Sequence, residues 1–213
     1  MTDASFSVDG SLARSTVSLN DAAAAVGGGE AADFTGASGA TLGWLVARAA
    51  EKARVLAIVP DTNAARLLAE DVRAFLGERA DELPPLVYPA SEITPFVEIA
   101  PERRTQMDRL GVLDHLAEGR PFSVLVVPVA ALLRRVPPPS SLAGRSLRVE
   151  VATSLDREAF LATLVRAGYT RTPVAEDPGT FAVRGSIIDV FPPRDPNPAR
   201  IELDDDTVTA IKR

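Results

Sequence analysis

Arg54-Val55-Leu56-Ala57-Ile58-Val59-Pro60 decides the fold, because it is a near-continuous apolar run without polar alternation. Such a run is typical of a strand that is buried on both faces, as strands of parallel sheets are. Asp61 follows at a helix N-cap position, and apolar residues then recur at helical spacing until Gly77, a residue type that ends helices. The stretch therefore predicts a strand that leads directly into a capped helix.

The same alternation extends on both sides of this unit. We expect a helix over residues 42–53 before it, and after it a short strand over 86–88, a helix over 101–118, a strand over 122–127 and a short helix over 130–135. Strands that alternate with helices indicate a parallel α/β sheet. Residues 1–30 are rich in alanine and glycine and carry few large apolar groups, which predicts a mobile tail. A short helix over 18–26 stays open as an alternative.

The pattern changes after the proline-rich stretch Pro137-Pro138-Pro139-Ser140-Ser141, which cannot continue a helix and reads as a stiff linker. Beyond it we expect one helix, over 156–167, and strands over 146–151, 169–174, 180–184, 186–191, 199–203 and 207–211. Closely spaced strands with a single helix predict a small α+β unit. The domains are then the tail at 1–30, an α/β domain at 31–137 and an α+β domain at 138–213.

Composition excludes several classes of function. The 213 residues carry a net charge of −6, which disfavours a nonspecific nucleic-acid binder, and the absence of cysteine excludes disulfides and thiolate chemistry. We find neither a signal peptide at the start of the chain nor an apolar stretch of about 20 residues, so we expect a cytoplasmic protein without a membrane partner. His115 is the one histidine, and no serine or cysteine constellation accompanies it, so we interpret it as a partly exposed structural residue.

A glycine-rich loop, Gly36-Ala37-Ser38-Gly39-Ala40-Thr41-Leu42-Gly43, lies where a phosphate-binding loop would precede the first helix. A working loop ends in G-K-[ST], in which the lysine reaches the phosphates and the hydroxyl holds Mg²⁺. Here Leu42 replaces the cation and Gly43 the hydroxyl. Two readings stay open: residual anion binding by backbone amides, or a tight turn that needs glycine. The candidate degenerate phosphate loop consists of Gly36, Gly39, Thr41, Leu42 and Gly43.

Two longer stretches carry a family resemblance. Residues 124–137, VLVVPVAALLRRVP, and 179–192, GTFAVRGSIIDVFP, resemble the UvrB-homology module at the N-terminus of the bacterial transcription-repair coupling factors (Mfd). The resemblance covers roughly residues 35–213. Two features separate the chain from UvrB itself, namely Leu42 in place of the loop lysine and the short stretch between Tyr88 and Pro101, which has no room for a tyrosine-rich DNA-probing hairpin.

The resemblance implies a degenerate, helicase-like parallel-sheet domain followed by a small α+β domain, and a recruitment role without catalysis. It implies that the second domain binds UvrA, through Arg171, Arg184 and Phe191. Phe191 would stand exposed as an apolar anchor among arginines. The alternative is that the arginines are ordinary surface charges and that Phe191 belongs to the core.

The resemblance also implies further partners, which are the motor and C-terminal domain of the parent chain and, through other domains, RNA polymerase and DNA. It implies no cofactor here, because ATP and Mg²⁺ would belong to the motor domains. Two rival functions stay open. A nucleotide-dependent DNA motor domain is disfavoured by Leu42, and a DNA-binding module is disfavoured by the acidic charge balance.

Overall fold

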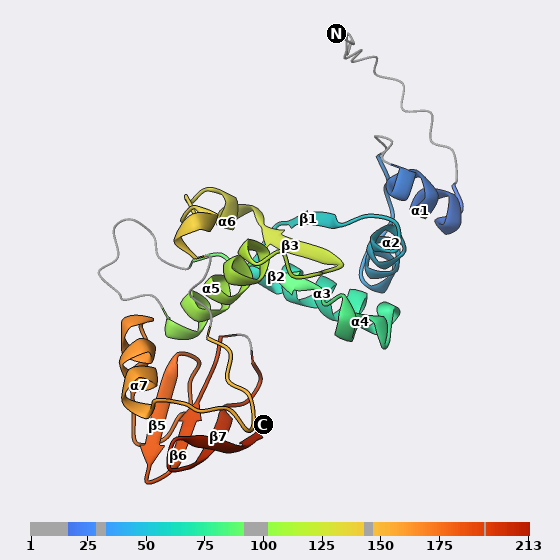
Figure 1. The fold of residues 1–213 in the computed structure, drawn as a ribbon. Coiled ribbons are helices and arrows are strands. Elements are labelled where there is room, and N and C mark those ends of the chain that lie inside the picture. Colours follow the sequence, from blue (N-terminus) through green and yellow to red (C-terminus); the bar gives the residue numbers. More distant parts are fainter. Residues whose placement is uncertain (1–16, 29–32, 92–101, 143–146, 194) are drawn as a thin grey trace.

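The computed structural model describes residues 17–28, 33–91, 102–142, 147–193 and 195–213. Figure 1 shows two sheet-bearing units, one formed by the blue-to-yellow part of the chain and the other by the orange-to-red part. Within the described ranges, no helix is long and apolar enough to cross a membrane. The expected absence of a hairpin before Pro101 falls on residues 92–101, which lie outside the described residues.

The first unit contains a three-stranded parallel sheet, which confirms the predicted α/β class. Its strands β1 (Val55–Val59), β2 (Leu86–Val87) and β3 (Val124–Pro128) lie in the order β1-β3-β2. The register pairs Ala57 with Val126 and Ile58 with Val127. The crossovers are α3 (Thr62–Leu76) with the single turn α4 (Arg79–Glu82), and then α5 (Arg103–Ala117).

Helices cover the two faces of this sheet unequally. Helices α2 (Ala40–Ala50) and α3 pack on the face that carries Val124 and Val126, both fully buried. Helix α5 packs on the other face, where Val112 meets Val127. The predicted cap of α3 is confirmed, because the Asp61 side chain accepts a hydrogen bond of 2.8 Å from the Ala64 amide. After β3 come the short α6 (Val129–Leu132) and the 3-10 turn η1 (Pro139–Ser141).

The N-terminal segment is more ordered than the predicted tail. Helix α1 (Leu19–Gly28) forms within it, and Ala22 and Ala23 are buried against Leu45 and Trp44 of α2. Small side chains let the two helices approach closely, so packing replaces the missing large apolar groups. The prediction of a mobile tail is therefore wrong for residues 19–28, and the alternative of a short helix is confirmed. Residues 1–16 lie outside the described residues.

The second unit is a five-stranded mixed sheet with one helix, α7 (Arg157–Arg166). Phe160 and Leu164 of α7 pack on a core that includes Phe181 and Ile188. Only the β4–β5 pair is parallel. In order across the sheet, the strands are β4 (Thr170–Arg171), β5 (Thr180–Arg184), β6 (Ile187–Val190), β7 (Ala199–Asp204) and β8 (Thr207–Lys212).

Two strand predictions in this unit are wrong in extent. The described part of the strand expected over 146–151 has no strand structure, and only Ser154 forms an isolated bridge, to Thr207 of β8. Ala152 turns the chain just after this stretch, with a left-handed φ of 64°, and its amide donates to the Val208 carbonyl of β8 at 2.8 Å. The strand expected over 169–174 shortens to two residues, because the chain turns away after Thr172.

Helix α5 connects the two units by side-chain contacts. The Arg103 guanidinium donates to the Gly179 carbonyl at 3.1 Å and to the Thr170 hydroxyl at 2.8 Å. Met107 fills the space beside Gly179, where an added Cβ would lie 2.8 Å from the methionine sulfur. Gly179 also has a φ of +79°, so glycine is required there by both backbone and space.

Candidate interaction surface

The glycine-rich loop begins a helix in a way that uses its own amides. Gly36 and Gly39 have positive φ angles of 87° and 53°. The amide of Thr41 donates to the Ser38 carbonyl at 3.3 Å, and those of Leu42 and Gly43 donate to the Gly39 carbonyl at 3.0 and 3.3 Å. These N–H groups close the first helical turn, so they do not form the open amide nest that phosphate loops present.

Gly43 has a packing reason of its own. It is buried where α2 crosses α3, and an added Cβ would lie only 2.3 Å from Cβ of Asp71. A hydroxyl-bearing side chain has no room at this position. Leu42 lies on the exposed side of α2. These contacts favour the tight-turn reading of the loop over anion binding.

The second sheet has one face toward α7 and one face away from it, which we call the open face. Side chains alternate along each strand, so cross-strand register assigns each residue to a face. Phe181, Ile188 and Ile201 lie on the α7 side. Residues of the open face form two rows across the strands, namely Ala182, Asp189, Arg200 and Lys212, and Arg184, Ile187, Glu202 and Ala210.

Ion pairs order the middle of the open face. The Arg200 guanidinium binds the Asp189 carboxylate in a bidentate fashion, with Nε and Nη2 at 2.8 and 3.1 Å from its two oxygens. The Asp189 side chain is 11% exposed and that of Arg200 is 47% exposed. The hydrogen bond and the charge of Asp189 raise the pKa of Arg200 above its ordinary value. Lys212 pairs with Glu202 at 2.6 Å. The face therefore presents fixed charges of both signs.

Arg184 lies at one end of this face and is held by a neighbouring loop. Its Nη2 donates to the Pro173 carbonyl at 3.0 Å, in the loop that connects β4 and β5. The side chain remains exposed at the end of β5, opposite Ile187. A guanidinium fixed in this way loses less conformational entropy when it binds a partner.

Phe191 does not stand exposed, so that prediction is wrong. Its side chain is only 4% exposed and packs against Ala175 and Ala182. The β4–β5 loop carries Ala175 over the end of the open face where β5 begins, opposite to the end at Arg184, and covers the ring there. Phe191 therefore contributes to the core of the unit, as the alternative reading held.

Arg171 is exposed, but it lies on the other face from Arg184. It pairs in parallel register with Phe181, whose side chain packs on the α7 side. One flat surface therefore cannot contain both arginines. Arg200, which sequence reasoning left out of the site, shares the open face with Arg184. The signal that could have identified Arg200 is the alternation of polar and apolar residues along β7, which places Arg200 and Glu202 on the same face.

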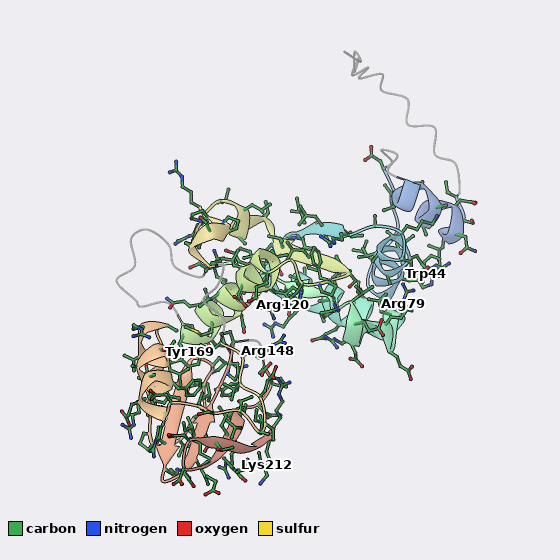
Figure 2. All side chains as sticks on the ribbon, viewed as in Figure 1. Trp44, Arg79, Arg120, Arg148, Tyr169 and Lys212 are labelled. Atoms are coloured by element: carbon green, nitrogen blue, oxygen red, sulfur yellow. The ribbon has the colours of Figure 1, made fainter. Side chains whose placement is uncertain are left out.

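His115 and Tyr169 are both buried or half-buried, away from the open face. His115 is buried, against the expectation of partial exposure, and its Nε2 lies 2.9 Å from the Pro121 carbonyl, which fixes the tautomer with the proton on Nε2. Tyr169 lies where the two units meet, in a cavity of about 560 Å³ whose walls come from α5, α7 and β7 (Figure 2). Burial, with added repulsion from Asp195 and Asp114, raises the pKa of Tyr169 to about 12.

Comparison with known proteins gives a consistent set of relatives. A family model of the UvrB interaction domain matches residues 147–213, which contain α7 and the whole five-stranded sheet. The chain is 39% identical over 83% of its length to a transcription-repair-coupling factor of Myxococcus xanthus. It is 33% identical over 70% to that of Bacillus subtilis, and 31% identical over 84% to that of Escherichia coli. It spans 15%, 12% and 15% of the lengths of these three relatives.

Proposed function

The chain belongs to the transcription-repair coupling factor family, and from this premise we propose that it is a non-catalytic recruitment module whose second unit binds UvrA. In the parent protein, this binding would connect a stalled RNA polymerase to nucleotide excision repair. The polymerase, the DNA and the ATP-driven motor would be contacted through other domains. The motor and C-terminal domain of the parent chain are further proposed partners.

The open face of the five-stranded sheet is the surface that we assign to UvrA. The observation that carries this assignment is that Arg184 and the Asp189–Arg200 pair lie together on the face opposite α7. The region matched by the family model contains this face completely. Planar guanidinium groups bind carboxylates in a bidentate fashion and are enriched among the residues that dominate interfaces.

The charges of this face predict the chemistry of the partner. Arg184 presents a cation at the edge of the face, and the buried Asp189 already neutralises part of the charge of Arg200. A partner that offers carboxylates opposite Arg184 and Arg200 would form charge-assisted hydrogen bonds there. Ile187, half-buried between Arg184 and Glu202, would supply apolar contact. The interface would thus combine acidic groups of UvrA with a small apolar centre.

A calorimetric titration of UvrA tests this assignment. We expect Arg184→Ala to weaken binding by about 1–3 kcal/mol, the usual range for an interface arginine. Arg171→Ala is the matched control, because Arg171 is an exposed arginine of the same sheet on the opposite face. We expect this variant to bind UvrA with the same affinity as the unsubstituted protein. If Arg171→Ala weakens binding and a folded Arg184→Ala does not, the open face is the wrong surface.

A further inference from the structure

A cleft of about 320 Å³ lies in the first unit, apart from both the open face and the glycine-rich loop. Its floor comes from Tyr88, just after β2, and its walls come from α5 and from the segment that follows α6. The polar side chains that line it come from Tyr88, Ser91, Glu102, Thr105, Gln106, Arg109, Arg134 and Arg135. Apolar atoms make up most of the lining, so the cleft combines an apolar surface with a small set of hydrogen-bonding groups.

The position of the cleft in the sheet is one that ligands commonly use. It lies beyond the carboxyl end of β2, beside the chain that leaves the carboxyl end of β3, on the face covered by α5. In open parallel sheets, ligands bind in crevices outside the carboxyl ends of the strands. The glycine-rich loop leads into α2, which packs on the opposite face. The two sites are therefore separated by the sheet.

The charge of the cleft differs in sign from that of the chain. Among the described residues, three guanidinium groups, from Arg109, Arg134 and Arg135, line it together with one carboxylate, from Glu102. The whole chain carries a net charge of −6, so this local excess of positive charge is a departure from its surroundings. Glu102 also accepts a hydrogen bond of 3.2 Å from the Thr105 hydroxyl. An anionic ligand matches this field.

Tyr88 and Arg109 form a rigid wall of the cleft. The Arg109 guanidinium stacks 4.2 Å from the centre of the Tyr88 ring, and its Nη1 donates to the Pro89 carbonyl at 2.6 Å. Tyr88 is only 6% exposed, and its hydroxyl has no hydrogen-bond partner within the part of the chain that the structure describes. A buried hydroxyl without a partner costs free energy, and polar ligands or water commonly satisfy such groups.

We propose that this cleft binds a phosphate-bearing ligand with an apolar or aromatic body, the chemical class of a mononucleotide. Arg134 and Arg135 would contact the phosphate oxygens, as guanidinium groups do in bidentate phosphate recognition. Leu110, Leu113 and Val136, which also line the cleft, would contact the body of the ligand. The volume suits a small ligand of this kind. The proposal is independent of UvrA binding, since it involves the other unit.

Calorimetry with four probes tests the proposal: adenosine 5′-monophosphate, inorganic phosphate, adenosine, and sodium chloride at matched ionic strength. We expect the monophosphate to bind, phosphate to bind more weakly, and adenosine and chloride to give no saturable signal. Arg135→Ala should weaken monophosphate binding about tenfold, the effect of losing one charge-assisted contact. Arg104→Ala is the matched control, because Arg104 is an exposed arginine of α5 that does not line the cleft.

Three results would overturn the proposal. The first is no saturable binding of the monophosphate, and the second is an equal loss of binding in Arg104→Ala and Arg135→Ala, which would indicate a diffuse charge effect. The third is equal affinity for phosphate and the monophosphate, which would show that the body of the ligand makes no favourable contact with the apolar residues of the cleft. Arg134→Ala, which removes the other guanidinium that we propose to contact the phosphate, provides a second variant if Arg135→Ala fails to fold. It should also weaken monophosphate binding, and unchanged binding in a folded Arg134→Ala would contradict the proposal.

Discussion

The two sheets of this protein differ in what their uncovered surfaces carry. In the first unit, Leu56 and Ile58 of β1 are 57% and 56% exposed, on the side of the sheet away from α2 and α3. In the second unit, the open face carries ion pairs, while Phe181 and Ile188 on the α7 side are at most 1% exposed. An apolar surface gains from burial, whereas a face of paired charges is stable in water. The uncovered face of the second sheet is therefore stable in contact with water, whereas the uncovered face of the first sheet exposes apolar side chains.

This comparison predicts that the two units unfold separately. Phe181→Ala should destabilise the second unit by about 3–5 kcal/mol, because it removes a large, fully buried ring. Phe75→Ala, at a 48% exposed position on α3, is the control and should have a much smaller effect. Trp44, the single tryptophan, lies on α2, far from the five-stranded sheet, and reports on the first unit alone (Figure 2).

Urea unfolding followed by two probes measures the effect. In Phe181→Ala, the circular dichroism transition should move to lower urea, while the Trp44 fluorescence transition should stay in place. A common shift of both transitions would show that the units unfold as one, and it would contradict the proposed boundary near residue 137.

A smaller effect is expected in the first unit from Gly43→Ala. The added methyl would overlap Asp71 where α2 crosses α3, and overpacking of this kind costs about 1–3 kcal/mol. The Trp44 fluorescence transition should therefore move to lower urea. Gly28→Ala is the matched control, because nothing lies within 4 Å of a Cβ added there. Equal stability of the two variants would contradict the close packing of α2 on α3.

The smallest effect concerns pH and the place where the units meet. The pKa of Tyr169 is raised from 10.0 to about 12, so the folded protein holds this proton more tightly than the unfolded chain does. Its contribution to stability is complete below pH 10 and is lost as the pH rises through 12. Spectrophotometric titration should show no tyrosine of the folded protein ionising at its ordinary pKa, since burial also raises the pKa of Tyr88. Tyr169→Phe should flatten the alkaline loss of stability, and an unchanged profile would contradict this assignment.

Local signals in the sequence predict the strand and the helix of the β1–α3 unit, but the expected burial of β1 on both faces is wrong, because Leu56 and Ile58 are exposed on one face. The apolar run, the Asp61 cap and Gly77 act within a few residues of one another, so no knowledge of tertiary contacts is needed. The packing of α1 was not predictable in this way, because Ala22 and Ala23 become a core only when Trp44 and Leu45 lie against them. The strand expected over 146–151 is absent from the described part of that stretch, although Ser154, just after it, forms a bridge to Thr207 of the distant strand β8.

The residues of the candidate surface could likewise be predicted only where their exposure does not depend on tertiary contacts. Sequence reasoning selected Arg184, which is exposed on the open face, and the UvrA contact of this residue stays a prediction. It could not place Phe191, because the residue that covers it, Ala175, comes from a loop on the other side of β5. It also could not separate Arg171 from Arg184, because their faces depend on the register of β4 with β5.

Hydrogen exchange of the protein, alone and bound to UvrA, shows which face of the second sheet UvrA covers. We expect UvrA to slow exchange in the β4–β5 loop and in the exposed end of the β5–β6 hairpin near Arg184, while α7 and the first unit keep their rates. Protection confined to α7, or to α2 and α3, would contradict the assignment of the open face to UvrA.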